Sequence, residues 1–242
     1  MEKISLSDIG NVREKNQDSF LDLTEYNIPL FVIADGMGGH KSGEVASSDA
    51  VKIIKEVFLE NKEGLNDKKI IKSIIEESIK KSNEIIYKES LESPECSGMG
   101  TTISLCYIYE NCILIGHVGD SRIYLIQDKE IFQLTEDHSL VYELVKKGEI
   151  TLDEAKHHPK RNMITRAVGT SSSIEVDILD KKYREGDKLI LCTDGLFNMV
   201  DEIEILNTIN EGSSIFESGE MLINKAKLNG GLDNISLILV KF

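Results

Sequence analysis

Residues 101–119, TTISLCYIYENCILIGHVG, decide the fold class of this chain. Apolar residues dominate both halves of the stretch, and the polar dipeptide Glu110-Asn111 divides them. Two short apolar runs joined by a two-residue turn are typical of an antiparallel β-hairpin. Residues 121–127 (SRIYLIQ) and 130–135 (EIFQLT) follow directly. They predict that the hairpin continues as a meander.

Helical periodicity appears on both sides of these strands. Residues 44–60 and 67–90 each place apolar side chains on one face, and Asn66 or Asp67 suits the N-cap of the second helix. Downstream, the pattern predicts a strand at 188–193, helices near 201–210 and 214–228, and a last strand at 234–242. Hairpins alternating with helices predict an α+β fold, in which helices form layers outside antiparallel sheets. We expect one domain over residues 1–242, because no linker interrupts the pattern.

Composition limits the classes of partner. The chain has 242 residues and a formal net charge of −14, from 28 basic and 42 acidic residues. This charge disfavours nucleic acid and anionic membranes as partners. No run of 18 apolar residues occurs, and the N-terminus lacks the pattern of a signal peptide, so we expect a cytoplasmic protein. The four cysteines contain no CxxC pair, and Cys106, Cys112 and Cys192, which lie inside apolar runs, are expected to be core residues.

Five aspartates lie beside apolar strands. Asp35 follows LFVIA, Asp120 follows ILIGHVG and Asp194 follows LILCT, while Asp233 precedes NISLILV and Asp18 precedes FLDL. A single aspartate at the end of a strand is usually a solvated turn residue. Here glycines flank most of them. If the strands share one sandwich, their ends can bring these carboxylates together at one rim.

Several carboxylates within about 5 Å of one another need raised pKa values or a bound cation. An oxygen-only ligand set favours Mg²⁺ or Mn²⁺ over zinc. Two such ions could activate a water for attack on phosphorus. Arg13, five residues before Asp18, is the candidate for holding the phosphoryl oxygens. A solvated surface arginine is the alternative interpretation.

Eight sequence blocks occur in an order that resembles the metal-dependent Ser/Thr protein phosphatase family of the 2C type, in its small bacterial form. The blocks are DIGNVREKNQDSF, VIADGMGGHKSGEVAS, GMGTT, IGHVGDSRIYLI, LTEDHSLV, HHPKRNMITRAVG, LILCTDGLF and GLDNISLILV. Together they run nearly from end to end of the chain. The resemblance implies a central β-sandwich of two antiparallel sheets flanked by antiparallel helices, with metals in a cleft at one end.

The resemblance also implies a role for each acid. Asp35 would bridge two metal ions. The carbonyl of Gly36 and, partly through water, Asp18 would complete one site, and Asp194 and Asp233 would hold the other. Asp120 would join Asp194 in binding a weaker third ion. Arg13 would bind the phosphate.

One position departs from the pattern of many eukaryotic relatives. They carry a histidine directly after the Asp-Gly pair, proposed to protonate the leaving oxygen, whereas this chain has Met37, as is common in bacterial members. A thioether cannot donate a proton. His40 or a metal-bound water could supply it instead, and a polar residue at a helix entry is the simpler interpretation of His40.

The insertion at about 137–170 resembles the mobile flap of bacterial members. Its sequence predicts two short helices. Arg161 and Arg166 are candidates for contacts with a phosphopeptide, Arg166 also for a structural role. We assign His117, His138, His157 and His158 to structure or to the flap.

The predicted function is hydrolysis of phosphoserine and phosphothreonine in proteins, in one step and without a phosphoenzyme. Expected partners are phosphoprotein substrates, by analogy a Ser/Thr kinase and its targets, and we expect a monomer. A phosphatase-like binding module without activity, a hydrolase of small phosphomonoesters and a plain structural protein remain alternatives. The first two are separated by assays of phosphate release, and the third predicts no affinity for metal.

Overall fold

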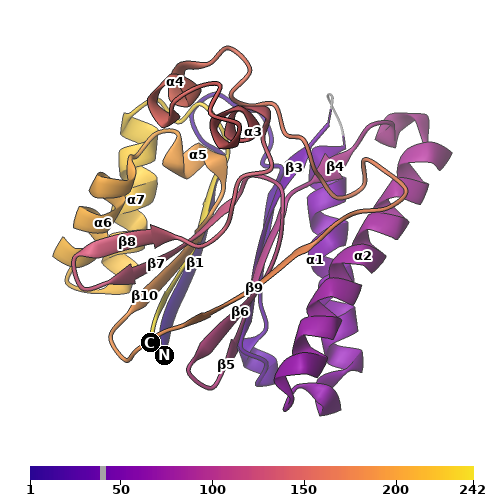
Figure 1. Cartoon of the computed structure of the whole chain (residues 1–242), viewed down its shortest axis with the longest axis horizontal. Coiled ribbons are helices and arrows are strands. Elements are labelled where there is room, and N and C mark those ends of the chain that lie inside the picture. Colours follow the sequence, from indigo (N-terminus) through magenta and orange to yellow (C-terminus); the bar gives the residue numbers. More distant parts are fainter. Residues whose placement is uncertain (39–41) are drawn as a thin grey trace.

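The computed structural model describes residues 1–38 and 42–242. Two antiparallel β-sheets stack face to face, and helices cover the outer face of each sheet (Figure 1). This confirms the α+β fold and the layer order α-β-β-α. Both chain termini lie at the same end of the sandwich, opposite the end that carries α3, α4 and α5 (Figure 1).

The strands and helices have the following bounds. The strands are β1 Glu2–Asp8, β2 Asp18–Asp22, β3 Leu30–Met37, β4 Gly100–Thr101, β5 Ile103–Tyr109, β6 Cys112–Val118, β7 Arg122–Gln127, β8 Glu130–Gln133, β9 Asp177–Lys182, β10 Lys188–Cys192 and β11 Ile235–Lys241. The α-helices are α1 Gly43–Glu60, α2 Lys68–Glu92, α3 Leu140–Lys146, α4 Leu152–His157, α5 Asp194–Phe197, α6 Glu202–Glu211 and α7 Ile215–Leu228. Short 3-10 helices span Thr24–Tyr26, Lys62–Gly64 and Pro94–Cys96.

The hairpin predicted from residues 101–119 is formed by β5 and β6. The two strands pair antiparallel, with Tyr109 opposite Cys112, and Glu110 in the turn has a φ of 50°. One sheet has the order β1-β11-β10-β7-β8. The other has the order β2-β3-β5-β6-β9, and β4 pairs with β3.

The predicted meander is wrong at one connection. β7 and β8 pair with each other, but β7 pairs with β10 in the other sheet instead of with β6. The chain crosses from one sheet to the other at Gly119–Ser121, where Gly119 has a φ of 110°. Both β6 and β7 are buried along almost their whole length, so their sequences carry no polar face to distinguish the sheets.

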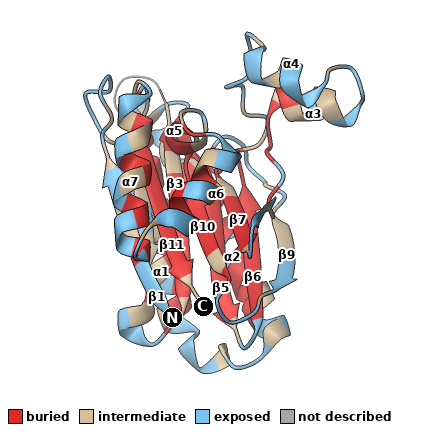
Figure 2. Ribbon diagram, turned by 90° about the vertical axis from the view of Figure 1, so that its left-hand side faces the viewer, coloured by how far each residue is buried: buried red, intermediate tan, exposed pale blue. Residues whose placement is uncertain are grey.

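Three layers of apolar side chains hold the elements together. One layer fills the space between the sheets, and it includes Phe31, Ile115, Leu125 and Leu191. A second packs α1 and α2 against one sheet, and a third packs α6 and α7 against the other. Figure 2 shows buried strands between helices whose outer faces are exposed. Burial on both faces of each sheet explains the nearly continuous apolar runs in the sequence.

The helices follow the sequence pattern closely. The predicted helices at 44–60 and 67–90 correspond to α1 and α2. The Asp67 carboxylate accepts hydrogen bonds from the backbone N–H groups of Lys69 and Ile70, which confirms it as the N-cap of α2. In the part of the chain that the structure describes, every helix is too short or too polar to cross a membrane.

Residues 137–170 include the two predicted short helices, α3 and α4. Both stand beyond the end of the sandwich; α4 is mostly exposed, whereas α3 is mostly half-buried (Figure 2). Backbone hydrogen bonds hold the base of this segment. Leu140 donates its N–H to the Met163 carbonyl at 2.9 Å, and Thr165 donates to the His138 carbonyl at 2.8 Å, so the two ends of the flap pair with each other.

Candidate metal centre

The five aspartates come from both sheets. Asp18 begins β2 and lies opposite Asp35 in the β2–β3 register, whereas Asp194 and Asp233 adjoin β10 and β11 of the other sheet. Asp120 lies in the crossing between the sheets. The sequence suggested that Asp35 follows its strand. In fact β3 continues to Met37, because Gly36 and Met37 pair with β4.

Two glycines allow the chain segments at this rim to approach closely. A Cβ atom on Gly195 would lie 1.9 Å from the Asn234 carbonyl oxygen, so only glycine lets the start of α5 lie against the segment before β11. A Cβ atom on Gly36 would lie 2.0 Å from the Gly43 carbonyl oxygen at the start of α1. These approaches place the residues next to the glycines, Asp194 and Asp35, in contact with neighbouring segments.

Burial and mutual repulsion raise the pKa values of the acids. Burial raises the pKa of Asp120 to about 8, with further contributions from Asp194 and Asp137. Burial raises the pKa of Asp18 to about 7, and the charges of Asp194 and Asp233 add to the effect. The pKa of Asp194 rises to about 6, again through burial first and Asp233 second.

Asp35 lies at the centre of this repulsion. Burial raises its pKa well above the usual range, and the carboxylates of the other four acids raise it further, in the order Asp18, Asp194, Asp120 and Asp233. The five acids therefore share one electrostatic environment. Among residues 1–38 and 42–242, however, no three His, Cys, Asp or Glu side chains are already grouped closely enough to enclose an ion.

A divalent cation fits the oxygen atoms at this rim. Oδ1 of Asp18 is buried and has no hydrogen-bond partner among residues 1–38 and 42–242, while Oδ2 accepts a hydrogen bond from the Thr193 hydroxyl at 2.9 Å. A buried carboxylate oxygen without a partner is costly, and a cation would satisfy it. The acids provide oxygen ligands only, which are the ligands of Mg²⁺ and Mn²⁺.

Arg13 lies beside the acids. Its Nη2 is 2.6 Å from Oδ2 of Asp233, and its side chain is 50% exposed. The hydrogen bond to Asp233 raises the pKa of the guanidinium, and the charges of Asp194 and Asp35 act in the same direction. Arg13 thus remains accessible to an anionic ligand while it is oriented by one of the acids.

Asn234 holds the loop that carries Arg13. Its amide donates to the carbonyls of Ile9 and Lys15, both at 2.9 Å, and its Oδ1 accepts the Gln17 N–H at 2.8 Å. One side chain next to Asp233 therefore fixes both ends of the segment around Arg13.

Sequence reasoning singled out none of the polar residues that support the acids. Besides Thr193 and Asn234, these include Thr102, whose hydroxyl accepts the Asp35 N–H at 2.9 Å and lies 2.7 Å from the Ser121 hydroxyl. Asn198 donates to Oδ2 of Asp194 at 3.1 Å. Thr102, Thr193 and Asn234 lie within the sequence blocks that resemble the family, which is the signal that could have identified them. Their hydrogen-bond partners are distant in sequence and become visible only in the fold.

The remaining candidates are His40, Arg161 and Arg166. His40 lies outside the described residues. Arg161 is exposed in the flap, where residues 159–163 line a hollow that contains none of the acids. Arg166 forms an ion pair with Asp177 at 2.7 Å, which supports the structural role considered for it.

The fold and the site define the class of protein: a layered α-β-β-α sandwich that carries clustered carboxylates and an arginine at one rim. The family model for protein phosphatase 2C matches residues 11–232. The chain therefore belongs to the protein phosphatase 2C family.

Individual relatives agree with this assignment. The serine/threonine phosphatase stp of Listeria monocytogenes is 37% identical over 236 residues, which cover 97% of this chain and 93% of the relative. A solved serine/threonine phosphatase of S. agalactiae superposes with a TM-score of 0.92 at 37% identity, covering 98% of each chain. The catalytic domain of the phosphatase PstP, solved in complex with two manganese ions, superposes with a TM-score of 0.85 at 30% identity, covering 99% of this chain and 97% of that one. This chain is thus a protein-serine/threonine phosphatase, and its substrates are phosphoproteins.

Proposed function

We propose that this phosphatase hydrolyses phosphoserine and phosphothreonine at a centre of two divalent cations, Mn²⁺ or Mg²⁺, held by Asp18, Asp35, Asp194 and Asp233. The observation that carries the proposal is the set of raised pKa values around Asp35, together with Oδ1 of Asp18, which is buried without a hydrogen-bond partner in the part of the chain that the structure describes. Unpaired carboxylates that destabilise each other are expected where a cation belongs. The two manganese ions of the PstP relative support the same choice of ligand.

Each acid is given the role that the resemblance to the family implies. Asp35, which all the other acids affect, would contact both ions. Asp18 and the Gly36 carbonyl would complete one site, and Asp194 and Asp233 the other. Asp120, whose pKa responds to Asp194, would help to hold a weaker third ion. When bound, the cations supply an activated water and neutralise charge on the phosphoryl group.

The residues of the chain itself bind and orient the substrate. Arg13 would turn from Asp233 toward the phosphate and hold two of its oxygens, and Asn234 keeps the loop around it in place. Met37 has no proton to donate, so the proton for the leaving serine or threonine oxygen comes from another source. His40 remains a candidate for that role.

The wider assignments are also proposals. We propose that the chain acts as one catalytic domain and as a monomer in the cytoplasm, and that it reverses the action of a Ser/Thr kinase. The exposed flap, with Arg161 on its surface, would contact the peptide around the phosphate. The charge of −14 makes neutralisation by bound cations useful for any phosphorylated substrate.

The substitution Asp35→Asn tests the metal centre. Loss of a carboxylate that repels four others should raise the unfolding temperature of the metal-free protein, because the repulsion is relieved. The same change should abolish Mn²⁺ binding in a calorimetric titration. Exposed Asp128, in a left-handed turn with a φ of 54°, offers a matched control, since asparagine adopts this conformation as readily. A lower unfolding temperature with Mn²⁺ binding unchanged would contradict a metal role for Asp35.

A further inference from the structure

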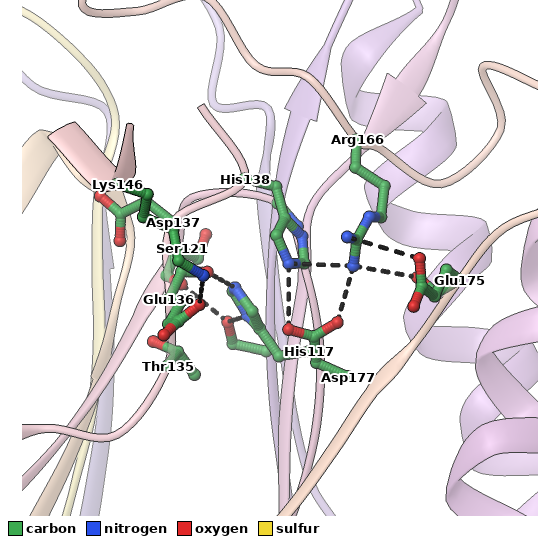
Figure 3. Close-up of polar contacts among 12 residues, drawn as sticks. His117, Ser121, Thr135, Glu136, Asp137, His138, Lys146, Arg166, Glu175 and Asp177 are labelled. Carbon is green, nitrogen blue, oxygen red and sulfur yellow. Dashed lines mark hydrogen bonds and ion pairs between the residues drawn. The ribbon is translucent and has the colours of Figure 1, made fainter. Parts of the chain in front are cut away.

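His138 lies at the base of the flap and contacts the residue that precedes Asp120. The imidazole is buried, at 8% exposure. Its Nδ1 accepts the Gly119 N–H at 3.0 Å, and the backbone N–H of His138 donates to the Gly119 carbonyl at 2.8 Å. The ring and the main chain of one flap residue therefore hold both sides of Gly119. Figure 3 shows His138 between His117 and Arg166, above Asp177.

The contacts of His138 define its protonation. A backbone N–H only donates, so Nδ1 must carry a lone pair, and the proton must lie on Nε2. Nε2 is 3.2 Å from Oδ2 of Asp177, which accepts this proton. Arg166 also only donates. Its Nη1 lies 3.0 Å from Nε2 of His138 and 2.7 Å from Oδ1 of Asp177, so the Asp177 carboxylate is the acceptor for both donors. Burial and the nearby Arg166 lower the pKa of His138, in agreement with a neutral ring.

His117 packs against the His138 ring. The two ring centroids are 4.9 Å apart. His117 is fully buried, and its Nε2 donates to the Glu136 carbonyl at 3.0 Å, while Nδ1 lies 2.9 Å from the Ser104 hydroxyl. Burial lowers the pKa of His117 to about 3, so this ring is neutral as well. His138 thus packs against a neighbour that is itself fixed.

These contacts bear on Asp120 because both of its neighbours in sequence are held. Gly119 adopts a φ of 110°, and a Cβ atom there would lie 2.6 Å from the side chain of Thr102. On the other side, the Ser121 hydroxyl lies 2.7 Å from the Thr102 hydroxyl, and the Ser121 carbonyl lies 3.0 Å from the Ser104 hydroxyl. Ser121 is therefore held by residues of the sandwich, whereas Gly119 is held by hydrogen bonds to His138 of the flap.

We propose that His138 is a positioning residue, which fixes the Gly119 peptide and thereby directs the Asp120 carboxylate toward the weakest of the cation sites. Because His138 also pairs with Thr165 at the other end of the flap, displacement of the flap base would displace Asp120. This inference rests on the proposed metal centre. It adds a residue that touches neither metal nor substrate and acts through a backbone hydrogen bond.

Two substitutions separate the two hydrogen bonds of the ring. His138→Asn keeps an acceptor at the distance of Nδ1 and loses the donor to Asp177. His138→Gln keeps a donor at the distance of Nε2 and loses the acceptor for the Gly119 N–H. Both remove the ring and leave similar space, so a merely structural role predicts the same result for both.

The measurement is calorimetric titration of each protein with Mn²⁺. His138→Gln should weaken the lowest-affinity site about 10–100-fold, the loss usual for residues that orient metal ligands, and His138→Asn should retain wild-type affinity to within about threefold. Asp120→Asn serves as the reference and should lose the same site. The tighter sites should be unchanged in both His138 variants.

Hydrogen exchange in the metal-free proteins gives a second readout. The Gly119 amide should exchange faster than in the wild type in His138→Gln and at the wild-type rate in His138→Asn. Equal Mn²⁺ affinities in the two variants, or equal losses, would overturn the proposal. A wild type that binds no Mn²⁺ would overturn the metal centre and with it the role of His138 toward a cation, while the exchange rates would still decide whether the ring holds Gly119.

Discussion

Asp120 has surroundings that differ greatly from those of a carboxylate in water. It is 8% exposed, and two neighbouring acids, Asp194 and Asp137, oppose its ionisation. Burial raises its pKa to about 8, whereas an unfolded chain would ionise near 3.8. The folded, metal-free protein therefore holds a proton on Asp120 at a pH where the unfolded chain has lost it. Asp18, with a pKa of about 7, behaves in the same way.

This difference predicts how stability depends on pH without metal. Between about pH 6.5 and 8.5, the folded state binds more protons than the unfolded state, so stability must fall as the pH rises. The slope reaches up to about 1.4 kcal/mol per pH unit for each carboxyl that titrates only in the folded state. His117 and His138 have lowered pKa values, so they act in the opposite direction where the unfolded chain protonates its histidines, below about pH 7.5, and this reduces the slope in the lower part of the range.

Urea unfolding in EDTA across this pH range checks the prediction. Asp120→Asn should show a smaller slope than the wild type, and Asp128→Asn the full slope. Stability that stays constant or increases with pH would show that the acids ionise as they do in water.

At the scale of single residues, the sequence identified the acids but not the polar residues that form hydrogen bonds with them. Asp35 and Asp194 could be selected because each adjoins an apolar run that predicts a strand. Thr102 carries no comparable signal, since a threonine in a strand is ordinary, and its partners Asp35 and Ser121 become neighbours only in the fold. The pairing of Arg13 with Asp233 also depends on the fold, because 220 positions separate the two residues.

At the scale of elements, local patterns predicted hairpins and helices well. The β5–β6 and β7–β8 pairs follow the turns seen in the sequence. The crossing between β6 and β7 could not be predicted, because both strands are buried on both faces and either sheet would accept them. Strand β9, outside the predicted elements, pairs with β6 and has exposed residues at most of its positions, so its sequence lacks a strong apolar signal.

One side chain on α2 anchors the chain where the flap returns to the sandwich. Asn83 is buried, accepts the Gly169 N–H at 2.8 Å, and donates to the Ser171 carbonyl at 3.0 Å. Asn83→Ala would leave the Gly169 N–H without a partner, at a cost of about 1–3 kcal/mol in the free energy of unfolding. The flap should also be cleaved faster by trypsin.

Glu84→Ala is the matched control for this change. Glu84 is exposed on the same helix, next to Asn83, so its loss should alter stability by less than about 0.5 kcal/mol. If Asn83→Ala proves as stable and as resistant to trypsin as Glu84→Ala, the anchor has no energetic role.

At the scale of the whole molecule, the site exists only where the two sheets meet. Asp18 and Asp35 belong to one sheet, and Asp194 and Asp233 adjoin strands of the other. The apolar layer between the sheets therefore sets the spacing of the acids. This arrangement explains how a buried strand positions a carboxylate at the rim. The apolar residues of the strand are fixed by packing, and the acid lies where the apolar run ends.

The most direct test of the metal-dependent centre is phosphate release from a phosphothreonine peptide, measured with Mn²⁺, with Mg²⁺ and with EDTA. The wild type and Asp128→Asn should release phosphate only with a divalent cation, and faster from the peptide than from a sugar phosphate. Asp194→Asn should lose at least about 100-fold, the upper end of the loss for residues outside the ligand set. Release that persists in EDTA, or full activity in Asp194→Asn, would contradict a metal-dependent centre that includes Asp194.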